Sequence, residues 1–201
     1  MKYAARRGLT AASVLEQLEA TASAGMNHDT DWNSAPLGDL IHHIVTKHHE
    51  YLKTELPRIT ERLQKVMKVY GVQDAATLAP LPRLFADLRE EMERHMQKEE
   101  VVLFPFIERY EACLLAGHSI PPVPFGSIAN PIRMMEREHD SAGDFLRQIR
   151  DSTNGYSVPA HACITYRSLL DGMRETEEDL HMHIHLENNI LFPRAIALEN
   201  R

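Results

Sequence analysis

The chain has 201 residues, 43% hydrophobic and 25% charged, which suffices for one domain with a sizeable core. Its net charge of −7 argues against nucleic acid or an anionic membrane as a partner. No uncharged run is long enough to span a bilayer, and no apolar stretch follows the N-terminus as in a secretory signal, so we expect a cytoplasmic protein. Cys113 and Cys163 are predicted to be small buried thiols. Twelve histidines stand out, and they are spread through amphipathic segments.

Residues 1–30 are predicted to form a short helical remnant and a polar linker, and residues 31–201 a four-helix bundle. Apolar residues at helical spacing predict four long helices, at about residues 35–69, 82–115, 130–153 and 159–197. Ser34 is placed to cap the first helix, and Pro105 to interrupt the second. No segment alternates like a strand. The expected fold is all-α, an up-down-up-down bundle.

One motif occurs twice. Residues 95–105 read HMQKEEVVLFP and residues 183–193 read HIHLENNILFP: His, three residues, Glu, four residues, Phe-Pro. His and Glu four apart lie on the same face of a helix. His49 and His139, each followed by an acid, precede the two motifs at similar distances. Each half of the chain is thus predicted to be a helical hairpin that supplies one lone His and one His/Glu pair, and we expect the two to act together within their hairpin.

The helical period of 100° per residue indicates which polar residues face inward. It places both His/Glu pairs and His139 on the apolar faces of their helices. In the second helix this predicted apolar face includes Val102 and Phe106. In the first helix the period does not choose between His48 and His49, although the internal repeat favours His49. His181 and His185 are predicted to lie on the surface. His42 and His43 are predicted to lie either on the surface or around the ligand residues.

The inward-facing set consists of His49, His95, Glu99, His139, His183 and Glu187. Burying these groups unpaired would cost several kcal/mol each, whereas metal cations would neutralise the carboxylates. Four imidazoles and two carboxylates exceed one tetrahedral zinc site and suit two octahedral ions bridged by the carboxylates, with iron favoured, then manganese, then zinc. Gly143, four residues after His139, either leaves room for a small ligand or permits a close helix contact.

The HHE of the first helix, HMQKEEVVLFP, PFGSIANPIRMMEREHDSAG and HLENNILFPRA together resemble the hemerythrin-like proteins called repair of iron centres (RIC) proteins, over residues 30–200. The resemblance implies a four-helix bundle with a non-haem di-iron centre. The family's ligand positions fall on the six residues named above, with the glutamates and an oxo or hydroxo group bridging two iron ions. Family members commonly begin with a small domain containing a cysteine pair. Residues 4–20 resemble only its second half and contain no adjacent cysteines, so this domain is expected to be truncated, either because the chain begins late or because the pair has been lost.

The resemblance also implies a cytoplasmic role in protecting or restoring iron–sulfur proteins after nitrosative or oxidative stress. Its iron would react with nitric oxide or peroxide, or would be supplied to damaged clusters. The alternative is a hemerythrin-like carrier or sensor of oxygen or nitric oxide without turnover. No nucleophile triad or phosphate loop predicts another enzyme class. Expected partners are these small ligands and damaged iron–sulfur proteins, with the chain a monomer or weak homodimer.

Overall fold

The computed structural model describes residues 30–119 and 125–199. The chain divides into the units Met1–Ala35 and Pro36–Arg201. The predicted helical remnant in residues 1–29 lies outside the described residues. In the second unit the helical elements follow one another as α2 Leu37–His43, η2 Ile44–His49, α3 Glu50–Tyr70, α4 Ala75–Leu78, α5 Leu81–Lys98, η3 Glu99–Leu103, α6 Phe104–Leu115, α7 Ala129–Ser152, α8 Ile164–Leu186, η4 Glu187–Leu191 and α9 Phe192–Glu199.

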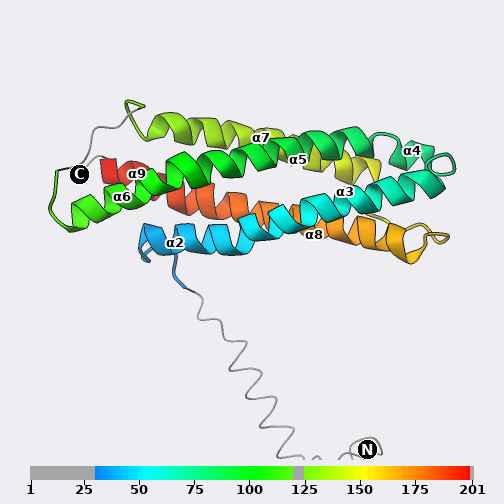
Figure 1. The fold of residues 1–201 in the computed structure, drawn as a ribbon, viewed down its shortest axis with the longest axis horizontal. Helices are drawn as coiled ribbons and strands as arrows, with labels where there is room; N and C mark the ends of the chain where they lie inside the picture. Colours follow the sequence, from blue (N-terminus) through cyan, green and yellow to red (C-terminus); the bar gives the residue numbers. More distant parts are fainter. Residues whose placement is uncertain (1–29, 120–124, 200–201) are drawn as a thin grey trace, which may run out of the picture. The chain divides into compact units, whose positions relative to one another are not determined.

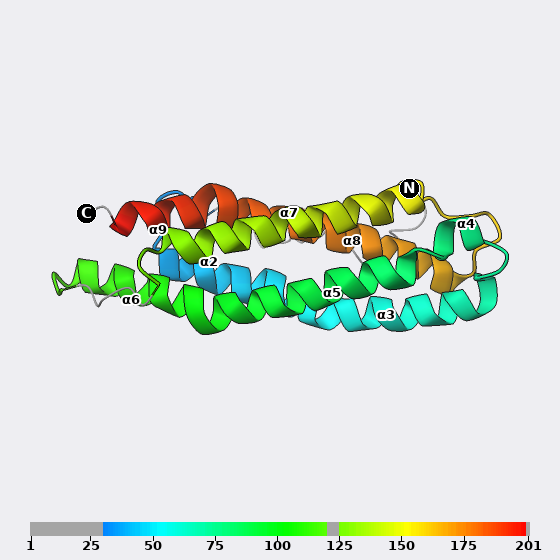
Figure 2. The same ribbon diagram turned by 90° about the horizontal axis from the view of Figure 1, so that it is seen from above.

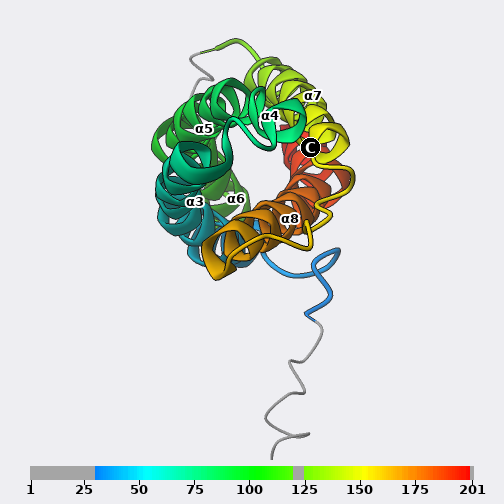
Figure 3. The same ribbon diagram turned by 90° about the vertical axis from the view of Figure 1, so that its right-hand side faces the viewer.

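These elements join end to end into four antiparallel rods. Along the bundle, α3, α5, α7 and α8 surround a common centre in chain order, and α8 returns beside α3 (Figure 3). The elements α2, α6 and α9 lie toward one end, whereas α4 lies in the turn at the other (Figures 1 and 2). The predicted all-α bundle is confirmed: the described residues contain no strand. None of their helices has the length and apolar character needed to cross a membrane.

Within the described residues, three of the rods contain a π-helical turn, labelled η2, η3 and η4. At the end of each turn a backbone N–H bonds to the carbonyl five residues back, as Phe104 does to Glu99 and Phe192 to Glu187. Pro105 and Pro193 follow directly. A proline donates no hydrogen bond and its ring collides with the carbonyl four residues back in a regular α-helix, so the wider turn accommodates it. The regular α-helix of the second rod is therefore interrupted by the π turn just before Pro105, at the place the prediction gave, and the rod continues as α6.

The extra residue of each π turn shifts the buried face of the helix beyond it. The predicted stripe through Val102 and Phe106 is wrong, because Val102 is 49% exposed while Leu103 and Ile107 are buried. A fixed step of 100° per residue no longer holds across a π turn. In the three rods that contain a π turn, the buried face can therefore be followed past the turn only when its extra residue is counted.

Two helix starts are capped by carboxylates from distant helices. The N–H groups of Leu37 and Gly38 donate to Glu111, and the N–H of Ile128, just before α7, donates to Glu199. Glu111 and Glu199 are 88 positions apart, the spacing of the repeated motif. Ser34, predicted as a cap, instead donates from Oγ to Asp31. The duplication thus extends to the contacts that close the bundle.

We expect Glu111→Ala to lower the free energy of unfolding by about 1–2 kcal/mol, because two N–H groups at a helix start lose a charged acceptor. Urea unfolding followed by circular dichroism would measure the change. Glu108→Ala, at an exposed position one turn earlier, is the matched control. Equal midpoints for the two variants would contradict a capping role for Glu111.

The cysteines differ from the prediction. Cys163 is exposed and Cys113 is only partly buried, and both are free thiols. Cys163 occupies the N-cap position of α8, ahead of the first helical residue, so the apolar pattern of that helix does not include it.

Candidate metal centre

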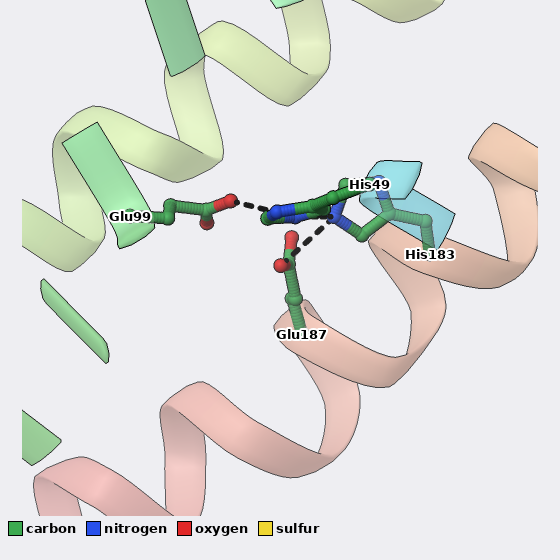
Figure 4. A group of neighbouring side chains, drawn as sticks. All are labelled: His49, Glu99, His183 and Glu187. Carbon is green, nitrogen blue, oxygen red and sulfur yellow. Dashed lines mark hydrogen bonds and ion pairs between the residues drawn. The ribbon is translucent and has the colours of Figure 1, made fainter. Parts of the chain in front are cut away.

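The structure brings the six predicted ligand residues together in the middle of the bundle. None of their side chains is more than about 4% exposed. They form two groups of four whose ligand atoms lie within 4.8 Å of one another, and both groups contain Glu99 and Glu187. His49 and His183 complete the first group, drawn in Figure 4, and His95 and His139 complete the second. Each group could hold a metal ion, with the two carboxylates shared between them.

The histidines pair across the two hairpins, and not within them as expected. The rings of His49 and His183 have centroids 4.8 Å apart, and those of His95 and His139 4.6 Å apart. In a closed four-helix bundle the first helix neighbours the fourth as well as the second, and the second neighbours the third. Each pair of histidines therefore lies where two neighbouring helices, one from each hairpin, face each other. Both hairpins contribute to each possible ion.

Glu187 faces both imidazole pairs with separate oxygens. Its Oε1 lies 2.9 Å from Nε2 of His183, and its Oε2 lies 3.1 Å from Nε2 of His139. Glu99 uses one oxygen: its Oε2 is 3.4 Å from Nε2 of His49 and 3.3 Å from Nε2 of His95. In Figure 4, Glu99 and Glu187 point toward the imidazoles from two different helices. This is the arrangement in which two carboxylates can bridge two cations.

The electrostatics of the cluster keep its acids ionised. Burial and the charge of Glu187 raise the pKa of the Glu99 carboxyl, but the neighbouring imidazoles outweigh them and lower it. Burial raises the pKa of Glu187 too, and His183 and His139 bring it well below its usual value. For His95, burial lowers the pKa, yet Glu99 and the hydrogen bond to Glu138 raise it to about 10. A metal ion would displace the imidazole protons and take over their role of neutralising the carboxylates.

The fit of a cation also follows from buried oxygens that lack hydrogen bonds. Among the described residues, neither oxygen of Glu99 receives one, and neither does Oε2 of Glu187. The imidazole Nε2 atoms meet in pairs, 3.1 Å apart for His49 and His183 and 3.0 Å for His95 and His139. Buried acceptors without donors and converging nitrogens are costly in a bare protein but suit metal coordination.

Three of the four imidazoles are held at the outer nitrogen, Nδ1. His49 donates to Glu100 over 2.7 Å, and Glu100 also pairs with Lys53. His95 donates to Glu138 over 3.0 Å, and Glu138 pairs with Lys98. A donor at Nδ1 leaves the lone pair of Nε2 free for a metal.

His139 is the third: its Nδ1 donates to Asn188 over 2.9 Å. Asn188 follows Glu187 as Glu100 follows Glu99. Sequence reasoning missed these outer partners, although their signal was present, because each directly follows a predicted ligand or, for Glu138, directly precedes one.

The phenylalanines of the repeated motif pack on the lone histidines. The ring of Phe104 stacks on His49 with centroids 5.7 Å apart, and Phe192 stacks on His139 at 6.1 Å. Both phenylalanines are buried. In each motif the proline therefore follows the π turn that begins at the proposed ligand glutamate, and the phenylalanine packs on an imidazole contributed by the other helix of its hairpin.

His48 and His49 are both buried, and the structure separates their places. His49 faces the carboxylates, whereas His48 lies outside them, with its ring stacked on that of His183. His181 and His185 are exposed, as predicted, and so is His42. His43 is half-buried and lies edge-on to His48. The six residues remain the proposed ligands.

Gly143 is half-buried in α7, and a Cβ built on it meets no neighbouring atom within 4 Å. The close helix contact considered above is therefore wrong, whereas an access path beside Gly143 remains a prediction. We expect Gly143→Ala to raise the free energy of unfolding by about 0.5–1 kcal/mol, because a helix-interior glycine gains helix propensity without a clash. The matched control is Gly172→Ala in α8, whose Cβ would lie 3.1 Å from Arg62 and which should bring no gain. Thermal and urea unfolding would compare them, and equal effects would contradict the difference in packing.

Comparison with known proteins agrees with this geometry. Residues 40–195 match the family described as the hemerythrin HHE cation binding domain. An iron-sulfur cluster repair protein YtfE of Cronobacter sakazakii is 36% identical over 199 residues, covering 99% of this chain and 83% of that protein. Proteins of the same name from Escherichia coli O81 and Escherichia fergusonii are 37% identical over 171 residues, covering 85% of this chain and 71% of theirs. The chain therefore belongs to the hemerythrin-like HHE cation-binding family, within the group of the RIC-type iron–sulfur cluster repair proteins.

Proposed function

We propose that this chain is a di-iron protein that protects or repairs iron–sulfur centres damaged by nitric oxide or oxidative stress. The observation that carries the proposal is the pair of imidazole groups that share two buried glutamates. The relatives named as iron–sulfur cluster repair proteins supply the reaction context. The proposed setting is the cytoplasm.

The donor set is the argument for two iron ions. Each proposed ion has two imidazole nitrogens and two carboxylate oxygens, so coordination beyond four ligands stays open for a small molecule. A mixed nitrogen and oxygen set without thiolate favours iron or manganese over structural zinc. Bound iron would supply electron transfer and a binding position for nitric oxide or peroxide. Manganese and zinc are the competing metals, and the metal analysis below tests for zinc.

The protein's own residues would keep this centre buried and in place. Glu99 and Glu187 would join the two ions, since each faces one imidazole of either pair. Phe104 and Phe192 cover the lone histidines and exclude water from their rings. The carboxylates behind the histidines lie nearer solvent; Glu100 is 27% exposed and Glu138 19%. Iron could be exchanged with a damaged cluster through this outer layer without unfolding the bundle.

The test loads the full chain with iron and adds it to an iron–sulfur enzyme inactivated by nitric oxide. Recovery of enzyme activity that is lost with Glu187→Leu would support repair. Reversible binding of oxygen or nitric oxide without recovery would favour the carrier or sensor instead, because the same ligands would serve both roles. Metal analysis showing one zinc ion per chain would contradict the di-iron assignment.

A further inference from the structure

The four imidazoles of the centre differ in how they are held from outside. His49, His95 and His139 each donate from Nδ1 to a carboxylate or an amide oxygen. Nδ1 of His183 is buried and has no hydrogen-bond partner among the described residues. Outer hydrogen bonds fix the orientation of a ligand imidazole and raise its basicity. His183 lacks this support.

Another imidazole, that of His48, lies parallel to the ring of His183. The interplanar angle is 8° and the ring centroids are 5.8 Å apart. His48 is 1% exposed, and its Nδ1 donates to Asp179 over 2.8 Å. Its Nε2 has no partner among the described residues. His48 thus packs beside His183 without accepting a hydrogen bond from its Nδ1 among the described residues.

The internal repeat shows that this contact is a departure from a shared plan. His48 precedes His49 as Glu138 precedes His139, and both positions face the histidine of a repeated motif. Glu138 binds Nδ1 of its neighbour, His95. His48 stacks on its neighbour, His183, without a hydrogen bond. One half of the duplicated site thus has a carboxylate where the other half has an imidazole.

We propose that the two metal positions are inequivalent and that the ion between His49 and His183 is released first, because His48 leaves His183 without an outer acceptor. The inference rests on the proposed function and specifies its iron-donating step: one ion is exchangeable and the other is retained. His48 is a positioning residue, since it acts through His183.

A comparison of the two positions gives the direction of the effect. Each position has one imidazole backed by a carboxylate, namely His49 with Glu100 and His95 with Glu138. The remaining imidazoles decide the difference: His139 has the amide of Asn188, and His183 has no acceptor. Loss of an outer partner typically costs a factor of about 10–100 in metal affinity. We expect release rates that differ by about tenfold or more.

The experiment follows iron release from the full chain. The protein is loaded anaerobically with Fe²⁺, the iron content is measured, and an excess of a coloured ferrous chelator is added. The expected result is two kinetic phases of equal amplitude, each one iron per chain. Release of two irons at a single rate would overturn the inference. Uptake of fewer than two irons would contradict the di-iron proposal itself, so the two failures are distinguishable.

Two variants assign the phases. In His48→Gln the ring is replaced by an amide that has both a donor and an acceptor; if its carbonyl oxygen accepts from Nδ1 of His183, the fast phase should slow toward the slow one. His42→Gln, at an exposed position on the same rod, is the control and should leave both phases unchanged. Unchanged fast release in a folded, fully loaded His48→Gln protein would overturn the role of His48.

Asn188→Ala tests the same inference without altering His48. It removes the outer acceptor of His139, so the slow phase should accelerate toward the fast one while the fast phase keeps its rate. A change in the fast phase alone would reverse the assignment of the two ions and overturn the inference. A merely structural role for these residues would change both phases together.

Discussion

Replacing Glu187 by leucine is expected to reduce the iron content from two ions per chain to one or none. Glu187 faces both imidazole pairs with different oxygens, so its loss removes a ligand from each proposed ion at once. Leucine has a similar size and no donor atom, and it leaves four buried imidazoles with one carboxylate. We also expect the recovery of damaged iron–sulfur enzymes to be lost, because it depends on the missing iron.

Metal analysis of the purified protein after anaerobic iron loading measures this prediction. Glu178→Leu, at an exposed position on α8, is the matched control and should keep its full iron content. Circular dichroism of both variants shows whether the bundle has formed. A folded Glu187→Leu protein that still holds two iron ions would show that Glu187 does not bridge the metals.

The fold and the six clustered residues were predictable because their signals are local and repeated. Helical spacing of apolar residues gave the four rods, and the spacing of His and Glu within one helix gave each motif its face. The end of α7 followed from Asn154 and Gly155, which adopt positive φ of 50° and 68°. These features need no knowledge of neighbouring helices.

The remaining features depend on contacts between helices. A π turn adds one residue to the period, so positions beyond it, such as Val102, were assigned to the wrong side. The pairing of His49 with His183 depends on the first helix lying beside the fourth. Outer acceptors such as Glu100 and Asn188 look like ordinary surface residues until the imidazole from another helix is in place.

The duplication explains the symmetry of the centre, and differences between the two copies make it depart from that symmetry. The proposed ligand glutamates, the stacking phenylalanines and the helix-capping glutamates recur at a spacing of 88 residues, so the bundle is two related hairpins closed on each other. The positions that differ between the halves lie just outside the ligands, where Glu100 corresponds to Asn188. Substitutions there would change the two proposed metal positions separately while the proposed ligands stay constant.

The same cluster makes the stability of the bundle depend on metal. Glu99 and Glu187 are fully buried, and three of their four oxygens receive no hydrogen bond from the described residues. Buried acceptors of this kind cost about 1–3 kcal/mol each, and more when charged. Protons on the imidazoles offset part of this cost. Burial alone would lower the pKa of His95, but the charge of Glu99 outweighs burial and the pKa is raised, so His95 holds its proton beside the carboxylate. A cation in each group would offset the cost more fully.

Removing the metal is therefore expected to lower the melting temperature by about 10 °C, because metal at about 1,000 times its Kd stabilises the native state by about 4 kcal/mol and a chain of this size shifts by about 2–4 °C per kcal/mol. Differential scanning calorimetry of iron-loaded and chelator-treated protein measures the shift. Glu187→Leu should show little dependence on added iron, since both proposed sites are damaged. Equal melting temperatures for loaded and stripped wild-type protein would mean that the buried carboxylates are already neutralised by the imidazoles alone.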